Sequence, residues 1–134
     1  MNYLVDTHII LWSLQGHSSL PEKARKILED ENNTLYYSIA NVWEVGIKYS
    51  LHKQEFIFKP MDFHRLCLES GYNLMNITVE HIATLDTLKR TEGSPEHKDP
   101  FDRILLAQAK TEGFMFLSHD NLLDGYCEDC LVKV

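Results

Sequence analysis

Residues 97–120 have the sequence HKDPFDRILLAQAKTEGFMFLSHD, and this stretch decides how the rest of the chain is interpreted. Asp99 followed by Pro100 is the pairing of an N-cap residue with proline at the first helical position. Gly113 is a typical stop at the C-terminus of a helix. The apolar run 114–117 then predicts a short buried strand, which ends near another acid, Asp120. The stretch therefore predicts a buried helix that leads directly into a buried strand.

Asp102 falls in the first turn of this helix, where the helix dipole favours a carboxylate. It shares one stripe of the helix with residues three, four and seven positions further on, which are Leu105, Leu106 and Ala109. An acid at the head of an apolar stripe points toward protein, and burying it without a partner costs several kcal/mol. A cation, a set of hydrogen bonds or a metal ion must offset that cost. The alternative is that Asp99 and Asp102 only cap the helix.

Helical and strand patterns alternate along the whole chain, which predicts an α/β fold with a mostly parallel sheet. We expect strands at 2–5, 35–38, 74–77, 114–117 and 131–134. We expect helices at 7–14, from Pro21 through Leu28, at 40–51, at 61–70, from Thr78 through Leu88, and at 100–112. Residues 52–59 form a connector in which Phe56 and Phe58 are either a hairpin edge or part of the core. A chain of 134 residues is long enough for one domain, 1–134, and too short for two.

The composition narrows the class of protein. A net charge of −7 does not fit a general nucleic-acid coat protein, which is basic. It does allow a nucleic-acid enzyme that concentrates carboxylates around metal ions. No apolar run approaches the length of a membrane span. The N-terminal segment lacks the basic start of a signal peptide, and an odd number of cysteines, three, favours reduced thiols. We therefore expect a cytoplasmic protein.

Four acids occupy comparable places in the predicted elements. Asp6 and Asp120 follow predicted strands, at the end where open α/β sheets place their ligand sites. Asp102 and Glu44 interrupt apolar helix faces, and the neighbours of Glu44 on its face are Ala40, Ile47 and Leu51. Two alternatives stay open. Asp6 or Thr7 is an N-cap for the next helix, or Glu44 forms a surface pair with Lys48 at helical spacing.

Four carboxylates in one pocket repel one another strongly unless cations are present. Ligand sets made only of oxygen suit Mg²⁺ or Mn²⁺, and ions held in this way activate water and stabilise phosphate. Asp99 is a candidate outer member of this set. Thr7 and Ser118 are either supporting hydroxyls or caps, and Arg103 pairs with Asp99, contacts phosphate or is solvated. The seven histidines have no metal-ligand spacing, so we take each as structural or exposed.

The sequence resembles the PIN domain family, and within it the VapC-type toxins of bacterial toxin–antitoxin pairs. The segments that carry the resemblance are YLVDTHIILW, SIANVWEVGIK, HKDPFDRILLAQA and FLSHD, which occur in order along the whole chain. The resemblance implies a three-layer α/β/α sandwich with a central parallel sheet. It also implies an endoribonuclease that depends on Mg²⁺ or Mn²⁺. The family's acidic metal-binding roles fall on Asp6, Glu44, Asp102 and Asp120, with Asp99 accessory. Homodimers, and a cognate antitoxin whose tail fills the acidic groove, are further implications.

Three other functions compete with this one. Phosphoryl transfer to an aspartate also places acids and Mg²⁺ at strand ends. It requires an adjacent acid and a lysine at a late strand end, and neither accompanies Asp6 or the strand at 114–117. A PIN-like nuclease outside a toxin–antitoxin pair is the second alternative. A PIN-like module that binds without catalysis is the third.

Overall fold

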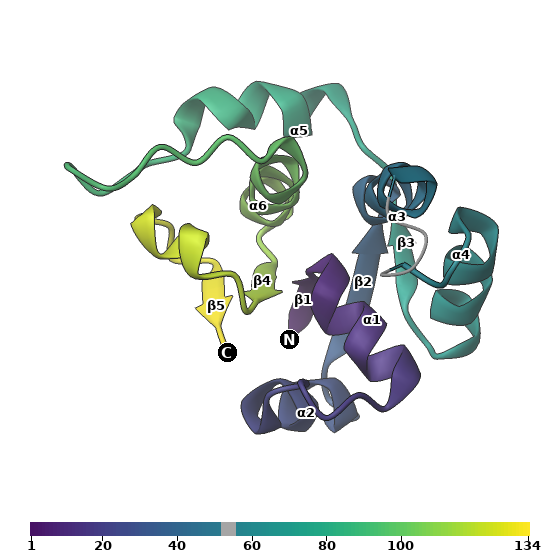
Figure 1. The fold of residues 1–134 in the computed structure, drawn as a ribbon. Coiled ribbons are helices and arrows are strands. Elements are labelled where there is room, and N and C mark those ends of the chain that lie inside the picture. The colour runs from purple at the N-terminus through teal and green to yellow at the C-terminus, as the bar shows by residue number, and fades with distance from the viewer. Residues whose placement is uncertain (52–55) are drawn as a thin grey trace.

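The computed structural model describes residues 1–51 and 56–134. Its strands are β1 Asn2–Val5, β2 Thr34–Ser38, β3 Asn73–Met75, β4 Met115–Ser118 and β5 Leu131–Lys133. Its α-helices are α1 Thr7–Gln15, α2 Glu22–Glu29, α3 Ile39–Leu51, α4 Pro60–Glu69, α5 Val79–Thr84 and α6 Pro100–Glu112. Two 3₁₀ helices, η1 Leu85–Thr87 and η2 Asn121–Gly125, complete the described elements (Figure 1).

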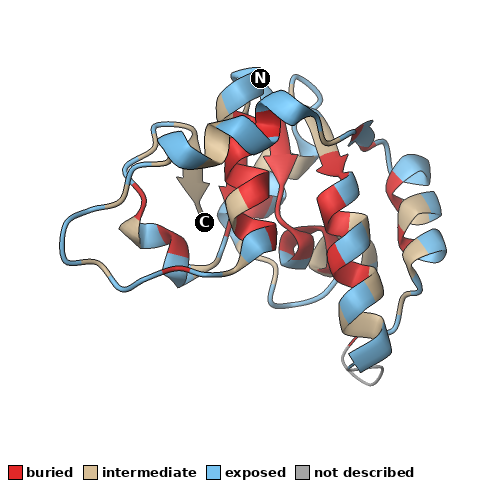
Figure 2. Cartoon of the chain, turned by 90° about the horizontal axis from the view of Figure 1, so that it is seen from above, coloured by how far each residue is buried: buried red, intermediate tan, exposed pale blue. Residues whose placement is uncertain are grey.

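The strands form one sheet in the order β3-β2-β1-β4-β5, and each pairing between these described strands is parallel. Alternate residues of β1 face opposite sides, so Tyr3 and Val5 belong to one core cluster and Leu4 to the other. The first cluster lies against α1, α2, α4 and part of α3, and the second against α6. Burial follows these two interfaces (Figure 2). The predicted three-layer α/β/α sandwich with a mostly parallel sheet is confirmed.

The strand order reverses its direction at β1. The chain moves outward from β1 through β2 to β3, then returns to place β4 on the other side of β1. In open parallel sheets, the crevice outside the carboxyl ends of the strands at such a switch point is where ligands bind. The backbone N–H of Asp6 donates to the carbonyl of Leu117, so the ends of β1 and β4 lie side by side.

The helix α6 has the boundaries that its sequence predicts. Asp99 is its N-cap and accepts from the backbone N–H of Phe101 and of Asp102, and Pro100 occupies the first helical position. Gly113 ends the helix with φ +72°, a left-handed conformation in which glycine has no Cβ to clash. Residues 104–109 of α6 are all buried, which is more than one full turn, so the middle of this helix is enclosed on every side. None of the helices in residues 1–51 and 56–134 is long and apolar enough to cross a membrane.

Two predicted elements differ from the structure by more than one residue at an end. The third strand covers 73–75 and not 74–77, because its partner β2 ends where Met75 pairs with Ser38. The helix predicted from Thr78 through Leu88 stops at Thr84 and continues as η1. Side chains of α6 satisfy two carbonyls there: Lys110 donates to Thr87, and Arg103 donates to Leu85. These side-chain donors take the place of the backbone N–H groups that a longer α5 would have offered to the two carbonyls.

The buried face predicted for α3 was correct for Ala40 and Glu44 and wrong for Ile47 and Leu51. Its buried residues are Ala40, Asn41, Glu44 and Val45. Ile47 and Leu51, expected on the same buried stripe as Glu44, are 36% and 70% exposed. The connector predicted at 52–59 lies partly outside the described residues, because 52–55 are not described. Within its remainder Phe56 is buried and Phe58 packs against the same cluster, so both belong to the core.

Candidate active site

A pocket of about 200 Å³ lies at the carboxyl ends of β1 and β4. Five acids line the pocket: Asp6, Glu44, Asp99, Asp102 and Asp120. The other lining residues are two histidines and a tryptophan, His8, His119 and Trp12, and one lysine, Lys48. The acids come from the ends of two strands, from α3 and from the start of α6. The structure therefore brings together Asp6, Glu44, Asp99, Asp102 and Asp120, the acids singled out from the sequence.

Asp6 is both a helix cap and a wall of the pocket. Its Oδ1 accepts from the backbone N–H of Thr7, and its Oδ2 accepts from the Ser118 hydroxyl at 2.6 Å. Burial raises the pKa of Asp6 to about 7, the bond from Ser118 opposes this, and the Glu44 charge adds to the rise. Asp6 is therefore the N-cap of α1 and an acid of the pocket at once, and Ser118 is its supporting hydroxyl.

Glu44 is held by Thr7 of α1 and by Lys48, one turn further along α3. Its side chain is 3% exposed, and Oε1 accepts from the Thr7 hydroxyl at 2.5 Å. Oε2 lies 2.6 Å from Nζ of Lys48, so the pair considered from the sequence forms, but at a buried carboxylate rather than on the surface. Asn41, which the sequence analysis missed, donates to the Thr7 hydroxyl and so fixes its direction. Asparagine beside a strand end gives no sequence signal that separates it from a turn residue.

Asp102 and Asp120 lie close together, and their pKa values are shifted in opposite directions. Burial raises the pKa of Asp102 far above its ordinary range, with further contributions from the Asp6 charge and a hydrogen bond to Asp120. The pKa of Asp120 is lowered despite the opposing effect of its own burial, chiefly by the hydrogen bond to Asp102. A proton shared between the two carboxyl groups accounts for both directions. Without a cation, sharing that proton avoids placing two negative charges side by side.

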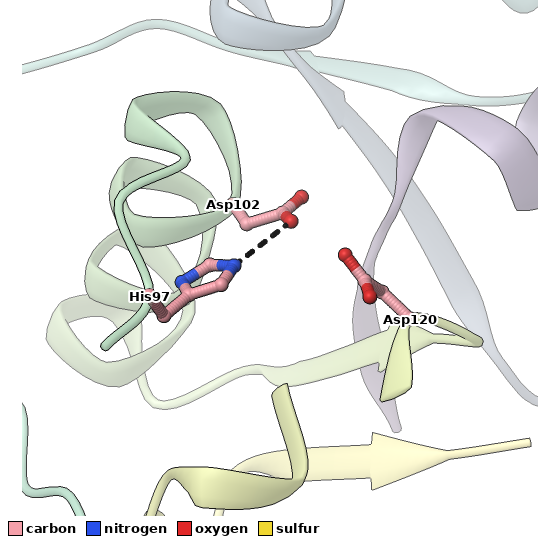
Figure 3. Close-up of side chains that lie close together, drawn as sticks. All are labelled: His97, Asp102 and Asp120. Carbon is pink, nitrogen blue, oxygen red and sulfur yellow. Dashed lines mark ion pairs between the residues drawn. The ribbon is translucent and has the colours of Figure 1, made fainter. Parts of the chain in front are cut away.

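His97 was taken as structural or exposed, yet it lies beside these two acids (Figure 3). Its side chain is 1% exposed, and Nε2 lies 3.4 Å from Oδ2 of Asp102. Nδ1 forms a 3.0 Å hydrogen bond with the hydroxyl of Tyr126. Burial lowers the pKa of His97, which favours the neutral ring. The only sequence signal was its position two residues before Asp99, since Tyr126 is distant in sequence.

Two other expectations resolve differently. Arg103 does not line the pocket, and its guanidinium donates instead to the Leu85 carbonyl at 3.5 Å. Of the three sequence alternatives for Arg103, this position matches neither a pair with Asp99 nor a phosphate contact in the pocket. The side chain is half-buried, so it is only partly solvated. His8 and His119 line the pocket, and the ring of His119 bonds through Nδ1 to the carbonyl of Val134.

The donor set fits a divalent cation. Among the described residues that line the pocket, Lys48 is the one lysine or arginine that faces five acids. It pairs with Glu44, and no lysine or arginine within residues 1–51 and 56–134 forms an ion pair with Asp6, Asp102 or Asp120. Carboxylate oxygens are the ligands that Mg²⁺ and Mn²⁺ take in proteins. A bound cation would replace the proton that Asp102 and Asp120 otherwise keep.

Together, the fold and the pocket define an α/β protein with a carboxylate-lined pocket at the switch point of a parallel sheet. The family model described as "PIN domain" matches residues 3–128. The chain belongs to the PIN domain family, and the resemblance found in the sequence is confirmed at that level. Comparison with curated protein sequences gave no significant match.

Solved structures with the same fold include several toxin–antitoxin complexes. The crystal structure of VapBC2 from Rickettsia felis bound to a DNA fragment from their promoter matches with a TM-score of 0.72 and 17% identity, covering 100% of this chain and 99% of that chain. A toxin–antitoxin complex from Klebsiella pneumoniae matches with a TM-score of 0.61 and 20% identity, covering 98% and 96%. VapBC-1 from nontypeable Haemophilus influenzae matches with a TM-score of 0.58 and 15% identity, covering 90% of this chain and 87% of that chain.

Proposed function

We propose that the chain is a Mg²⁺- or Mn²⁺-dependent endoribonuclease, and that it is the VapC-type toxin of a toxin–antitoxin pair. The observation that carries the proposal is the meeting of Asp6, Asp102 and Asp120, from three distant parts of the chain, without a cation of their own. Membership of the PIN domain family and the toxin–antitoxin complexes among its structural neighbours support it.

Each acid of the pocket, and each hydroxyl that supports it, has a role in this proposal. Asp6, Glu44, Asp102 and Asp120 hold the cation, and Asp99 is accessory because it also caps α6. Thr7 and Ser118 aim their hydroxyl protons at Glu44 and Asp6, which fixes the directions of those carboxylates. When bound, the cation would lower the pKa of a water and neutralise charge on a phosphodiester. Arg103 has no part, since its guanidinium lies against Leu85.

The proposed partners follow from the charge and the surface. RNA is the substrate, and the cognate antitoxin covers the acidic pocket with a basic side chain, which would take the place of the cation's charge. A homodimer accounts for the exposed apolar residues on successive turns of α3, which are Ile39, Trp43, Ile47 and Leu51. A cytoplasmic location, expected from the sequence, is part of the same proposal.

Cleavage of RNA by the purified chain tests the proposal. We expect cleavage with Mg²⁺ or Mn²⁺, none with EDTA, and at least a hundredfold loss, on the order of that seen when essential electrostatic groups are removed, in Asp6→Asn and Asp102→Asn. Asp62→Asn is the matched control, because Asp62 is an exposed acid on α4. Retained cleavage in EDTA or in either pocket variant would refute it. Metal binding without cleavage of RNA would favour the non-catalytic binding module instead.

A further inference from the structure

The buried ring of His97 has one nitrogen without a hydrogen-bond partner. Nε2 has no such partner among the described residues, although it is enclosed by protein. Its 3.4 Å approach to Oδ2 of Asp102 is an ion-pair distance and lacks hydrogen-bond geometry. A polar nitrogen buried without a partner is costly, and such atoms in native folds require an explanation. Here the nitrogen points at carboxylates (Figure 3).

The other nitrogen of the ring is fixed by Tyr126. Its hydroxyl lies 3.0 Å from Nδ1, and the guanidinium of Arg90 lies over the Tyr126 ring, 4.4 Å from its centroid. A histidine that binds a metal through one nitrogen almost always donates the N–H of the other to an oxygen, which fixes its tautomer. With the proton on Nδ1 directed to Tyr126, Nε2 keeps a free lone pair.

The three side chains are close enough to share one ion. One ligand atom of each of His97, Asp102 and Asp120 lies within 4.8 Å of the others. We propose that His97 donates Nε2 to the divalent cation beside Asp102 and Asp120, so that the cation site is a mixed nitrogen–oxygen site. This inference rests on the metal dependence in the proposed function and adds to it a ligand that is not an acid.

A nitrogen ligand changes which cation the site prefers. Mg²⁺ favours oxygen ligands in a strict octahedron, whereas imidazole suits transition metals. The site should therefore favour Mn²⁺ over Mg²⁺ by more than an all-carboxylate pocket would. The alternative is a charged His97 paired with Asp102 with no direct bond to the metal, and it predicts no such preference.

Pulsed electron paramagnetic resonance, with Mn²⁺ as the only added metal, distinguishes a metal-bound His97 from a His97 that only pairs with Asp102. We expect the protein to show ¹⁴N coupling from a directly bound imidazole, and His97→Asn to lose it. His8→Asn and His119→Asn are matched controls, since both histidines line the pocket outside the cluster, and both variants should keep the coupling. Coupling absent from the unmodified protein, or lost in a control and kept in His97→Asn, would overturn the inference.

Calorimetry with Mn²⁺ and Mg²⁺ adds a second readout. His97→Asn should lower Mn²⁺ affinity at least about tenfold, the scale on which even outer partners of ligands act, with a smaller loss for Mg²⁺. Should His97→Asn fail to fold, Tyr126→Phe keeps the ring and should retain the coupling with about tenfold weaker Mn²⁺ binding. Unchanged Mn²⁺ affinity in the folded variants would count against the inference.

The outcomes separate this inference from the proposed function. RNA cleavage with bound Mn²⁺ but no ¹⁴N coupling would refute the His97 ligand and leave the nuclease standing. Coupling without RNA cleavage would leave the His97 ligand standing and refute the nuclease. No Mn²⁺ binding at all would refute both.

Discussion

The hydroxyl of Ser118 lies 2.6 Å from Oδ2 of Asp6, across 112 residues of sequence. The same oxygen of Ser118 accepts from the backbone N–H of Asp120 at 3.1 Å. Ser118, at the end of β4, thus holds two acids of the pocket: Asp6, which follows β1, and Asp120, which follows β4. Because the bond to Asp6 favours the charged carboxylate, Ser118 keeps the pKa of Asp6 lower than burial alone would set it.

Ser118→Ala should lower the stability of the metal-free protein. At about pH 8 the variant leaves a buried, ionised Asp6 with one hydrogen bond fewer, which costs about 1–3 kcal/mol. Urea unfolding in EDTA measures the change. Ser50→Ala, at an exposed position on α3, should stay within about 0.5 kcal/mol of the unmodified protein. Equal stability of the two variants would show that the Ser118 bond contributes nothing.

Stability of the metal-free protein should fall as the pH rises from about 4 to about 7. The pKa of Asp6 is raised from 3.8 to about 7, so over this range the folded state binds more protons than the unfolded state. Between the two pKa values Asp6 is protonated in the folded state and ionised in the unfolded state. Each pH unit of rise in this range lowers the free energy of unfolding by up to about 1.4 kcal/mol. The raised pKa of Asp102 extends the fall to higher pH.

Asp6→Asn separates this effect from other titrations. The variant should show a flatter dependence of unfolding free energy on pH, and at about pH 8 it should be more stable than the unmodified protein in EDTA. Asp86→Asn, an exposed acid in η1, should leave the slope unchanged. A stability of the unmodified protein that rises with pH over this range would contradict the raised pKa.

Lys48 supplies the positive charge that the pocket has without metal. Lys48→Met should destabilise the metal-free protein by about 2 kcal/mol, because Glu44 remains buried while Lys48 is 30% exposed. The remaining negative charge should make Mn²⁺ stabilise the variant more than it stabilises the unmodified protein. Thermal unfolding with EDTA and with Mn²⁺ measures both.

Lys110→Met is the control for Lys48→Met. Lys110 has the same 30% side-chain exposure and lies in the last turn of α6. It pairs with Glu128, whose side chain is 7% exposed, and neither residue lines the pocket. It should lose comparable stability in EDTA but gain no extra stabilisation from Mn²⁺. An equal Mn²⁺ effect in both variants would show that Lys48 does not neutralise the cation site.

The apolar surface of α3 predicts the oligomeric state. If the chain forms the proposed homodimer, Ile47→Glu should convert it to monomers without loss of thermal stability in the monomer, since Ile47 is 36% exposed. Light scattering during gel filtration measures the mass. Gln15→Glu adds the same charge at an exposed end of α1 and should leave the mass unchanged. A monomeric unmodified protein would refute the homodimer.

The sequence predicts what depends on local pattern. Asp99, Pro100 and Gly113 determine the bounds of α6 through capping, and the structure has these bounds. Strand ends place Asp6 and Asp120 at one edge once the sheet is parallel, because all strands then end on the same side. The presence of Asp102 in the pocket follows from its position on the buried stripe of α6.

Long-range contacts were beyond the sequence. Periodicity placed Ile47 and Leu51 beside Glu44, but both are exposed. The buried side of α3 instead carries two polar residues, Asn41 and Glu44, together with Ala40 and Val45. Polar residues on a buried side are expected where a helix faces a site as well as the core. His97 depends on Tyr126, 29 residues away, and no local rule connects them.

Calorimetric titration of Mn²⁺ into the unmodified protein and into Asp102→Asn tests whether the gathered acids hold a cation. Saturable binding to the unmodified protein, weakened at least about tenfold in the variant, is the expected result. Equal affinity in the two proteins, or no binding to either, would show that Asp6, Asp102 and Asp120 meet for another reason.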